Sequence, residues 1–397
     1  MEGVPVRSVE YVVVGGGVVG AATAWNLARR GAEVTLLEAR ELACGASGGP
    51  GRRGVRAGGR DLRELPLARR ALELWPELDG LLGAATGYRR NGLLNLYDVE
   101  IAGVAGWQSL AARAQAQRAA GVPSEIVERD RLDEMQPGIA DDVRYALYTP
   151  HDGTADHPAT TRAFAKAAEG LGAAVVEHTT VAGLAPDADG AAVTLELATG
   201  ERLRAGRGVV LAANRSTPRL LRDAVGVTLH LWEKATQITF VTAPPGFVLN
   251  HQLGHGRRSL SVKVTDDGAV MLSGGRPGGW DPVAGVGTTD PDVLRTTLAD
   301  LAATLPALAG AEVLAVDNSR ADTSTIDLIP VIDTLPGLPS VVVAAGWSGH
   351  GFALAPAVAE ALTTWVLDGD RPYPLRPFTL DRLGATATGS WPTLTGP

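Results

Sequence analysis

Three glycines and one carboxylate near the start of the chain have the spacing of a dinucleotide-binding site. Gly15, Gly17 and Gly20 fit the pattern G-x-G-x-x-G. The first glycine permits a tight turn, the second lets the backbone approach a pyrophosphate, and the third allows a helix to pack closely on a sheet. Glu38 can accept both hydroxyls of an adenosine ribose, and its charge would repel a 2′-phosphate. We therefore expect FAD or NAD as the cofactor, and not NADP.

These residues require a βαβ unit around them, and the sequence predicts one. The apolar run 11–14 predicts a buried parallel strand, and 33–37 predicts a second. Between them, 18–30 predicts a helix that Gly31 ends. The N-terminus of this helix carries unpaired N–H groups and partial positive charge, which suit a phosphate. The coincidence of strand, helix, second strand and acid is a much stronger signal than a glycine pattern alone.

The composition is that of a globular protein of about two domains. The chain has 397 residues, of which 45% are hydrophobic and 20% charged. Its net charge of −8 and scattered arginines argue against nucleic-acid binding. We expect no membrane span, because the one long apolar run, 11–28, holds the glycine pattern. The N-terminus lacks signal-peptide features and Cys44 is the only cysteine, so we expect a cytoplasmic protein without disulfides. The oligomeric state stays open.

Further patterns divide the chain into alternating blocks. The runs 207–213 and 340–345 predict buried parallel strands that join the first unit, and 356–367 predicts a helix after them. From 227 to 279 the pattern is mainly β. The fold class expected is α/β, with a Rossmann-like domain assembled from three separated blocks and a mainly β (α+β) domain inserted. Further helices are predicted over 62–82, 102–120, 158–171 and 293–308.

Several segments give the chain a resemblance that covers nearly its whole length. They are the N-terminal GGGVVG with Glu38, the loop GASGGPGRR, the segment YTPHDGTADHP, the strand GVVLAAN, and the late pair TIDLIPVID and AAGWSGHGFALAP. With them the chain resembles the glycine oxidase, sarcosine oxidase and D-amino acid dehydrogenase (DAO) family of FAD-dependent oxidoreductases. The resemblance implies an FAD-binding domain over 1–85, 145–225 and 315–372, a substrate-binding domain over 86–144 and 226–314, and a surface tail over 373–397.

In that family the N-terminal unit binds the ADP half of FAD, and the SGHGF-type loop meets the isoalloxazine. Backbone N–H groups from Ser348 to Phe352 open a helix and would stabilise the negative charge of reduced flavin. His350 is either close to the cofactor or a histidine that stabilises the turn. The cofactor-binding residues expected are Gly15, Gly17, Val18, Val19, Gly20, Glu38, Ala39, Arg40, Ala46, Ser47, Arg53, Val181, Ala212, Ala213, Gly346, Ser348, Gly349, His350, Gly351 and Phe352.

The loop after Glu38 is where sarcosine oxidase-like enzymes place two arginines three residues apart. The resemblance puts Arg53 beside the flavin and Arg56 on the substrate carboxylate, whose two oxygens match a guanidinium. The alternative for Arg56 is an ordinary surface arginine. The reaction implied is oxidation of the C–N bond of an amino acid, N-alkyl amino acid or amine by hydride transfer to flavin N5, giving an imine that hydrolyses.

Departures from the family pattern bear on how FAD is held. The positions at which relatives attach the flavin covalently hold Arg320 and Gly49, where the relatives have cysteine and histidine. FAD is therefore expected to be non-covalent. Cys44 is expected to be a small buried residue.

Two further departures concern lysines. Ala353 replaces a lysine that makes a second contact to the substrate carboxylate. Met271 occupies the aligned position of the lysine that activates oxygen, and Lys263 is either its nearest substitute or an exposed hairpin lysine. The electron acceptor is accordingly O2 or another carrier such as a quinone.

The candidate catalytic residues are Arg56, Lys263 and His255. His255 is a possible proton acceptor, and the alternative is a solvated loop histidine. The seven histidines have no metal-ligand spacing, so no metal is expected. Two other functions remain open from the sequence: flavin-dependent oxidation of a 2-hydroxy acid, and a flavin-binding partner subunit without turnover.

Overall fold

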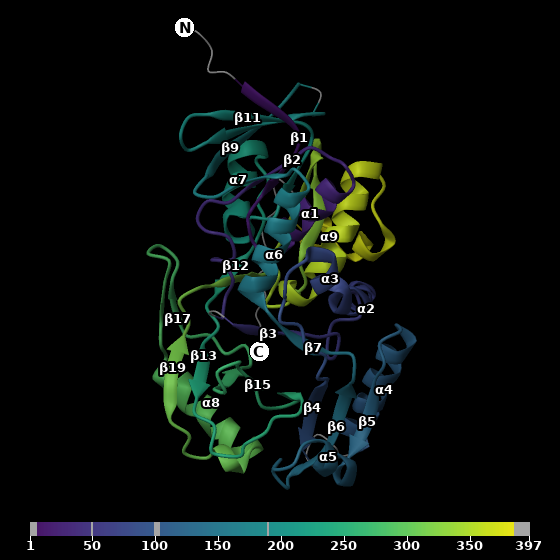
Figure 1. Ribbon diagram of the computed structural model, residues 1–397, viewed down its shortest axis with the longest axis vertical. Coiled ribbons are helices and arrows are strands. Elements are labelled where there is room, and N and C mark those ends of the chain that lie inside the picture. The colour runs from purple at the N-terminus through teal and green to yellow at the C-terminus, as the bar shows by residue number, and fades with distance from the viewer. Residues whose placement is uncertain (1–5, 49–50, 99–103, 189, 385–397) are drawn as a thin grey trace.

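The computed structural model describes residues 6–48, 51–98, 104–188 and 190–384 (Figure 1). Two large sheets lie one above the other in that view, and small two-stranded sheets accompany them. The fold class is α/β, as the sequence predicts. Among the described residues, no helix is both long and apolar enough to cross a bilayer.

The first sheet contains the predicted βαβ unit. Its strands follow the order β21-β22-β11-β1-β2-β8, and β10 and β9 continue it beside β11. β1 pairs in parallel with β2 and with β11, which confirms the placement of 207–213. The bounds are β1 (Val6–Val14), β2 (Val34–Leu37), β8 (Ala174–Val176), β9 (Val181–Pro186), β10 (Val193–Leu197), β11 (Arg202–Leu211), β21 (Val331–Leu335) and β22 (Leu338–Ala345).

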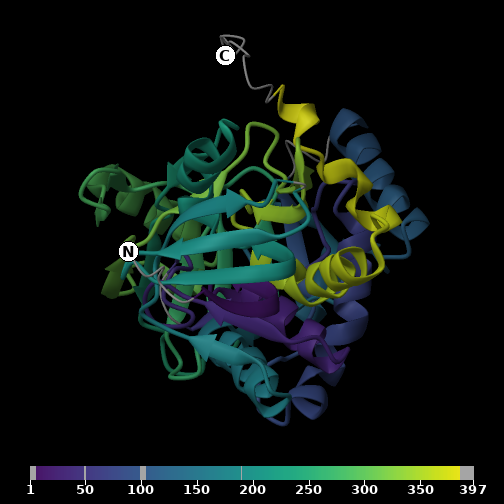
Figure 2. The ribbon, with the colours of Figure 1, turned by 90° about the horizontal axis from the view of Figure 1, so that it is seen from above.

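Helices cover this sheet and explain why the C-terminal parts of its central strands, 11–14 and 209–211, are apolar. The helix of the βαβ unit, α1, packs against α6 and α9, and α2 packs on α9. Figure 2 looks down on this layer, with α9 in yellow beside the purple N-terminal unit. The bounds are α1 (Val18–Arg29), α2 (Leu65–Leu74), α3 (Leu78–Leu82), α6 (His157–Gly170), α7 (Thr217–Val225) and α9 (Gly351–Asp368).

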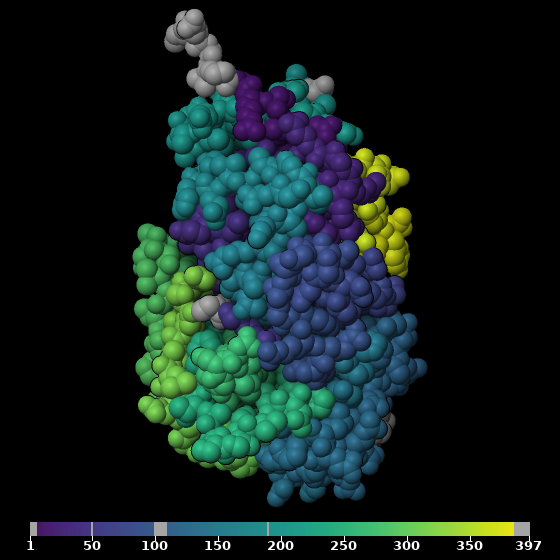
Figure 3. Space-filling view, in the orientation of Figure 1, coloured from purple at the N-terminus to yellow at the C-terminus, as the bar shows by residue number. Residues whose placement is uncertain are grey.

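The second sheet has the order β19-β13-β16-β15-β14-β4-β6-β5. It encloses a separate hydrophobic core and forms the lower part of the molecule in Figure 3. Its strands are β4 (Leu93–Asp98), β5 (Glu125–Glu128), β6 (Val143–Thr149), β13 (Ile238–Val241), β14 (Gln252–His255), β15 (Ser261–Val264), β16 (Val270–Ser273) and β19 (Val313–Asp317). Its helices are α4 (Val104–Ala119), α5 (Arg129–Met135) and α8 (Pro291–Thr304).

A short antiparallel pair lies between the two large sheets. β3 (Arg52–Val55) pairs with β7 (Gly153–Asp156), with Arg53 opposite Ala155. The sequence predicted only a loop over 39–60, because glycines and arginines there hide the strand. Two other pairs are β12 (Trp232–Lys234) with β20 (Asp322–Ser324), and β17 (Gly279–Asp281) with β18 (Val286–Thr288).

Three predicted helices have different bounds, each for a local reason. The helix over 62–82 is two helices, since a 3-10 turn at Trp75–Glu77 with Pro76 separates α2 from α3. α9 begins at Gly351, five residues before the predicted start, because Pro356 near the N-terminus removes only one hydrogen bond. α8 begins at Pro291, two residues before the predicted start, because the carboxylate of Asp290 caps it, and it ends at Thr304, before Pro306.

The predicted surface tail, 373–397, is described only in its first part, and 385–397 lie outside the described residues. A 3-10 helix at Tyr373–Phe378 brings two apolar side chains into the structure. Leu375 and Phe378 are fully buried in the main hydrophobic core. The prediction of a surface segment is therefore wrong for this part.

Gly20 packs so tightly against the preceding turn that no side chain fits. A methyl group there would lie 1.9 Å from the carbonyl oxygen of Gly15. We expect Gly20→Ala to lower the free energy of unfolding by about 3 kcal/mol, because two backbone segments must move apart. Gly17→Ala is the matched control, since a methyl group at Gly17 meets no atom within 4 Å. Urea unfolding of the proteins without added cofactor measures both, and equal midpoints for the parent and both variants would contradict the expectation.

Candidate active site

The glycine turn has the geometry that its spacing predicts. Gly15 has a φ of 113° and lies against Ala212 and Ala213, with a built Cβ only 2.5 Å from the carbonyl oxygen of Ala212. Gly17 is the N-cap of α1, with no side-chain cap and no acid in the first turn. The first N–H groups of a helix have no intrahelical partner. The start of α1 therefore presents backbone donors, including those of Val18 and Val19, with no acidic residue in the first turn of the helix.

Glu38 lies at the end of β2 and contacts the glycine turn directly. Its Oε2 accepts from the Gly16 N–H at 2.6 Å, and its Oε1 accepts from the Arg40 N–H at 2.9 Å. The carbonyl oxygen of Glu38 accepts from the Thr179 N–H, so the segment leading to Val181 runs beside Glu38 and Ala39. The part of the site that is predicted to bind adenosine is thus formed by three segments: the glycine turn, the end of β2 and the residues leading to Val181.

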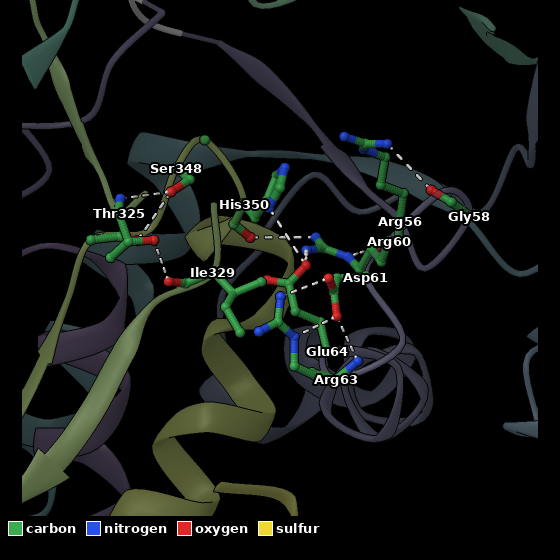
Figure 4. Close-up of polar contacts among 12 residues, drawn as sticks. Arg56, Gly58, Arg60, Asp61, Arg63, Glu64, Thr325, Ile329, Ser348 and His350 are labelled. Atoms are coloured by element: carbon green, nitrogen blue, oxygen red, sulfur yellow. Dashed lines mark hydrogen bonds and ion pairs between the residues drawn. The ribbon is translucent and has the colours of Figure 1, made fainter. Parts of the chain in front are cut away.

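The loop 346–350 leads from β22 to α9. Gly346, Ser348 and Gly349 all have positive φ, and Ser348 is unusual among them because it carries a side chain. Figure 4 shows Ser348 and His350 on this loop, next to the side chain of Thr325. Phe352, in the first turn of α9, packs edge-on to Trp75 and His157.

Two side chains that the sequence analysis missed hold this loop. Asn214 Oδ1 accepts from the Gly346 N–H at 3.0 Å, and Asp322 Oδ2 accepts from the Gly349 N–H at 2.5 Å. Asn214 also donates to Asp322 Oδ1 at 2.9 Å. Asn214 directly follows the apolar strand and Ala213, which is a signal that could have been read. Asp322 had no such signal.

Arg53 and Arg56 are both partly buried near the end of the 39–60 segment. Arg53 donates to the carbonyl oxygens of Ser47 and Gly48, next to Ala46, and burial lowers the pKa of its guanidinium to about 10. Arg56 Nη1 donates to the carbonyl oxygen of Gly58, and burial lowers the pKa of Arg56 as well. Arg56 is therefore not a fully exposed surface arginine, and its contact with a substrate stays a prediction.

Lys263 on β15 belongs to the same cluster. A built Cβ at Gly54 would lie 3.5 Å from Lys263 Cε and 3.9 Å from Arg56 Cδ. Burial lowers the pKa of Lys263 to about 7, and the charges of Arg56 and Arg53 lower it further in the same direction. Its Nζ donates to Ser261 Oγ at 2.8 Å.

One of the two alternatives for Lys263 is wrong. Lys263 is not an exposed hairpin lysine, since it is 7% exposed. Met271 pairs directly with Lys263 across β15 and β16, so both side chains lie on one face of the sheet. Met271 and Lys263 are therefore neighbours on the sheet.

A buried aspartate supports the segment that follows Arg56. Asp152 accepts from the Ala57 N–H at 2.7 Å and from the Gly58 N–H at 3.0 Å. Burial raises the pKa of Asp152 to about 6, although these two donors oppose the shift. Asp152 lies in the segment YTPHDGTADHP, and its role could not be read from the sequence. A further pair without a predicted role, Arg60 and Glu64, connects Arg56 to His350.

His255 does not belong to this cluster of contacts. It is 9% exposed, so the description as a solvated loop histidine is wrong. Its Nδ1 accepts from the backbone N–H groups of Arg257 and Arg258, and Arg258 Nη1 contacts its Nε2 at 3.1 Å. Burial lowers the pKa of His255 to about 4. Its contacts shape the 255–258 turn, which leaves it no evident role as a proton acceptor.

Among the other side chains with reactive potential, Cys44 is only partly buried, and burial raises the pKa of its thiol. The charge of Arg320 acts on both Arg53 and Cys44. Within the described ranges, no group of three or more His, Cys, Asp or Glu side chains could hold a metal ion. Gly49 lies outside the described residues.

The comparisons with known proteins agree with this geometry. The family model described as FAD dependent oxidoreductase (DAO) matches residues 10–365. The chain belongs to this family. FAD is therefore its cofactor.

Named relatives of this FAD-dependent oxidoreductase span nearly its full length. Sarcosine oxidase subunit beta of Arthrobacter sp is 26% identical over 95% of this chain and 92% of its own. Glycine oxidase of Geobacillus kaustophilus (strain HTA426) is 28% identical, over 94% and 97%. Among solved structures, L-proline dehydrogenase from P. horikoshii has a TM-score of 0.83 at 25% identity, covering 96% of this chain and 99% of that one. Glycine oxidase from Geobacillus kaustophilus has a TM-score of 0.80 at 25% identity, covering 94% and 98%.

The residues present fit FAD. The uncapped N-terminus of α1 offers N–H groups to a pyrophosphate, and Gly17 leaves open space where a Cβ would be. Glu38 stands at the end of β2, where a ribose would be bound. The N-terminus of α9, preceded by a loop of positive φ, offers a second set of donors.

Arg52 clamps the turn that follows Lys263. Its guanidinium, 4% exposed, donates through Nε and Nη2 to Asp266 Oδ1 and through Nη1 to the carbonyl oxygen of Gly87. Asp266 lies three residues beyond Lys263, so this contact joins β3 to the β15–β16 turn. Arg89 reaches the same carboxylate from the surface, where its side chain is 67% exposed.

We expect Arg52→Gln to lower the free energy of unfolding by about 1–3 kcal/mol, because buried acceptors lose their donor. Arg89→Gln removes the other partner of Asp266 and should change it by less than about 0.5 kcal/mol. Urea unfolding of the holoprotein compares the two. Equal losses from both variants would contradict the clamp.

Proposed function

We propose that this FAD-dependent oxidoreductase oxidises the C–N bond of an α-amino acid or of its N-alkyl derivative, giving an imine that hydrolyses. The observation that carries the proposal is the cluster formed by the buried Lys263 and the partly buried Arg53 and Arg56, next to the segment that begins at Glu38. Relatives named sarcosine oxidase and glycine oxidase support the same substrate class. When bound, FAD supplies the two-electron acceptor for this chemistry.

Arg56 is the residue proposed to bind the substrate carboxylate. In the part of the chain that the structure describes, its guanidinium makes no ion pair, and Asp152 and Glu64 act on it only from a distance. A buried guanidinium without a paired carboxylate is favourable only if an anion binds it. A bidentate carboxylate meets this requirement and also orients the α-carbon.

The remaining proposed roles follow from the positions of the residues. Backbone N–H groups at the start of α1 hold the pyrophosphate, and Glu38 holds the ribose. The 348–352 segment stabilises negative charge on the reduced cofactor. Binding is proposed to be non-covalent, because Arg320 stands where some relatives have the attaching cysteine. A reducing compartment, the cytoplasm, is proposed because the single cysteine has no internal partner for a disulfide.

O2 is proposed as the electron acceptor, with Lys263 as the residue that activates it. Reduction of O2 develops negative charge, and a fixed ammonium in a dry site stabilises that charge. Lys263 is buried beside the two arginines, and its pKa of about 7 leaves a substantial charged fraction near neutral pH. A quinone or other carrier would not require this lysine.

The carboxylate role is tested with Arg56→Ala. We expect the apparent Kd of an amino-acid substrate for flavin reduction to weaken by about 2–5 kcal/mol, because a charged partner is lost from a buried site. The amine that lacks the carboxylate, such as pyrrolidine against proline, should show no such change. Arg69→Ala, at the exposed surface of α2, is the control variant. Unchanged apparent affinity for the amino acid would remove Arg56 from the substrate site.

The oxygen role is tested with Lys263→Met in stopped-flow reoxidation of the reduced enzyme by O2. Reoxidation should slow by roughly 10²–10³-fold, while reduction by substrate changes little. In the wild type the active form is the charged ammonium, so the reoxidation rate should fall as the pH rises above about 7. Lys166→Met, on the exposed side of α6, is the control. A pH-independent rate that Lys263→Met leaves unchanged would favour another acceptor.

A further inference from the structure

A buried ion pair that has no role in the proposed function connects the segment of Arg56 to the loop that precedes α9. Glu64 is fully buried, and Arg60 Nη1 lies 3.3 Å from Glu64 Oε2. Arg60 also donates through Nε to the carbonyl oxygen of Arg56 at 2.5 Å and through Nη2 to that of His350 at 3.3 Å. Figure 4 shows Arg60 between Arg56 and the loop that carries His350. One guanidinium thus connects the proposed carboxylate-binding residue to the loop that precedes α9.

Glu64 also faces the ring of His350. Its Oε2 lies 3.5 Å from His350 Nδ1, at the outer limit of a hydrogen bond. Glu64 Oε1 and His350 Nδ1 are both buried without another partner among the described residues. In Figure 4 the second ring nitrogen of His350 points away from Glu64. The arrangement is that of a carboxylate that fixes the tautomer of an imidazole through one nitrogen and leaves the other free to act.

The charges around this pair favour an ionised carboxylate beside a neutral ring. Burial by itself raises the pKa of Glu64, but Arg60 and His350 outweigh it and hold that pKa below its ordinary value. Burial lowers the pKa of His350, and Arg60 and Arg56 lower it further while Glu64 opposes them. The other charged groups that face the ring are Asp61 and Asp322. A neutral imidazole whose Nδ1–H faces Glu64 has an acceptor lone pair on Nε2.

The other histidines near this place are less suited to accept a proton from a ligand. His157 packs against Phe352 with 4% of its surface exposed. His255 is held by Arg257 and Arg258 through both ring nitrogens. The side chain of His350 is 27% exposed and lies within electrostatic reach of Arg56.

We propose that His350 accepts the proton of the substrate ammonium group, and that Glu64 and Arg60 position it for this step. The inference rests on the proposed function. An amino acid arrives with a protonated amine, whose nitrogen lone pair is needed to stabilise the product as the C–H bond breaks. The N–H bond of the ammonium breaks, its proton forms a bond to His350 Nε2, and the resulting imidazolium is stabilised by Glu64. His350 is then a catalytic residue, and Glu64 and Arg60 are positioning residues.

The experiment is anaerobic stopped-flow reduction of the holoenzyme from pH 6 to pH 10, with whichever of glycine, sarcosine and proline reduces the wild-type flavin. At pH 7, His350→Gln should slow reduction by about 10²–10⁴-fold, the usual contribution of a positioned base. Glu64→Gln should slow it by about 10–100-fold, the usual effect of a carboxylate that orients a histidine. Both deficits should shrink as the pH approaches that at which the free amino acid loses its own ammonium proton.

Asp61→Asn is the matched control for a general charge effect. The charge of His350 also acts on Asp61, but Asp61 forms its ion pair with Arg63 at the surface. The pH profile of Asp61→Asn should follow that of the wild type. Flavin content and the melting temperature of each variant separate misfolding from slow chemistry.

The possible outcomes separate a failure of this inference from a failure of the proposed function. If wild-type flavin is reduced but His350→Gln slows it equally at every pH, or not at all, the inference is overturned and the function stands. If no amine reduces the wild-type flavin, the proposed function fails and the inference falls with it. If His350→Gln does not bind FAD, the pH profile of flavin reduction in the wild-type enzyme tests the inference instead. The inference expects the rising limb of this profile to have the same pKa with every substrate. A limb whose pKa follows that of each substrate amine would exclude a base on the enzyme.

Discussion

The active site depends on holding several positively charged side chains away from water. Arg60 and Lys263 are buried, and Arg53 and Arg56 are partly buried; the charges of Arg53 and Arg56 act on Lys263, and that of Arg60 acts on Arg56. Transfer of such groups from water is costly unless each is paired or hydrogen-bonded. Glu64 compensates Arg60 through an ion pair, and backbone carbonyl oxygens satisfy part of the others. The remaining cost appears as the lowered pKa values of Arg53, Arg56 and Lys263, and anionic ligands would relieve it.

The fold brings these cations together from the short β3–β7 pair, the segment that follows β3, and the second large sheet. Arg53 lies on β3, which is held to β7, while Lys263 lies on β15 of the second sheet. Arg52 ties the turn after β15 back to β3 through Asp266. The loop before α9 reaches the same place, held by Asn214 and Asp322. The site is therefore formed by segments that are far apart in the chain. Because these segments contact one another, a change in one of them, such as Arg52→Gln, should affect the others.

What could be predicted from the sequence was what local rules decide. The glycine turn, Glu38 and the apolar strands rest on short-range geometry and on burial by both faces of a sheet, and they follow from residue type and spacing. The bounds of α9 were wrong because a proline near a helix start costs less than one in its middle. β3 was missed because its residues, Arg52 to Val55, are set in a glycine-rich loop and pair only with a distant strand.

The parts that could not be predicted depend on contacts between distant segments. Lys263 was equally compatible with an exposed hairpin until the register of β15 placed it beside Arg56. Glu64 lies within the helix predicted over 62–82, where nothing in the sequence sets it apart, yet it is fully buried against Arg60 and His350. His255 was expected to be a proton acceptor or a solvated loop histidine. Its ring is instead buried, and both ring nitrogens contact Arg257 or Arg258.

The central claim is that this chain removes hydride from the carbon next to an amine. The most direct test is to record the visible spectrum of the purified holoprotein without oxygen while amino acids, N-methyl amino acids, simple amines and 2-hydroxy acids are added in turn. The account predicts that the flavin absorption bleaches with an amino acid or its N-alkyl derivative, not with the matching 2-hydroxy acid, and returns when air is admitted. Bleaching by a 2-hydroxy acid alone, or by no compound, would contradict it.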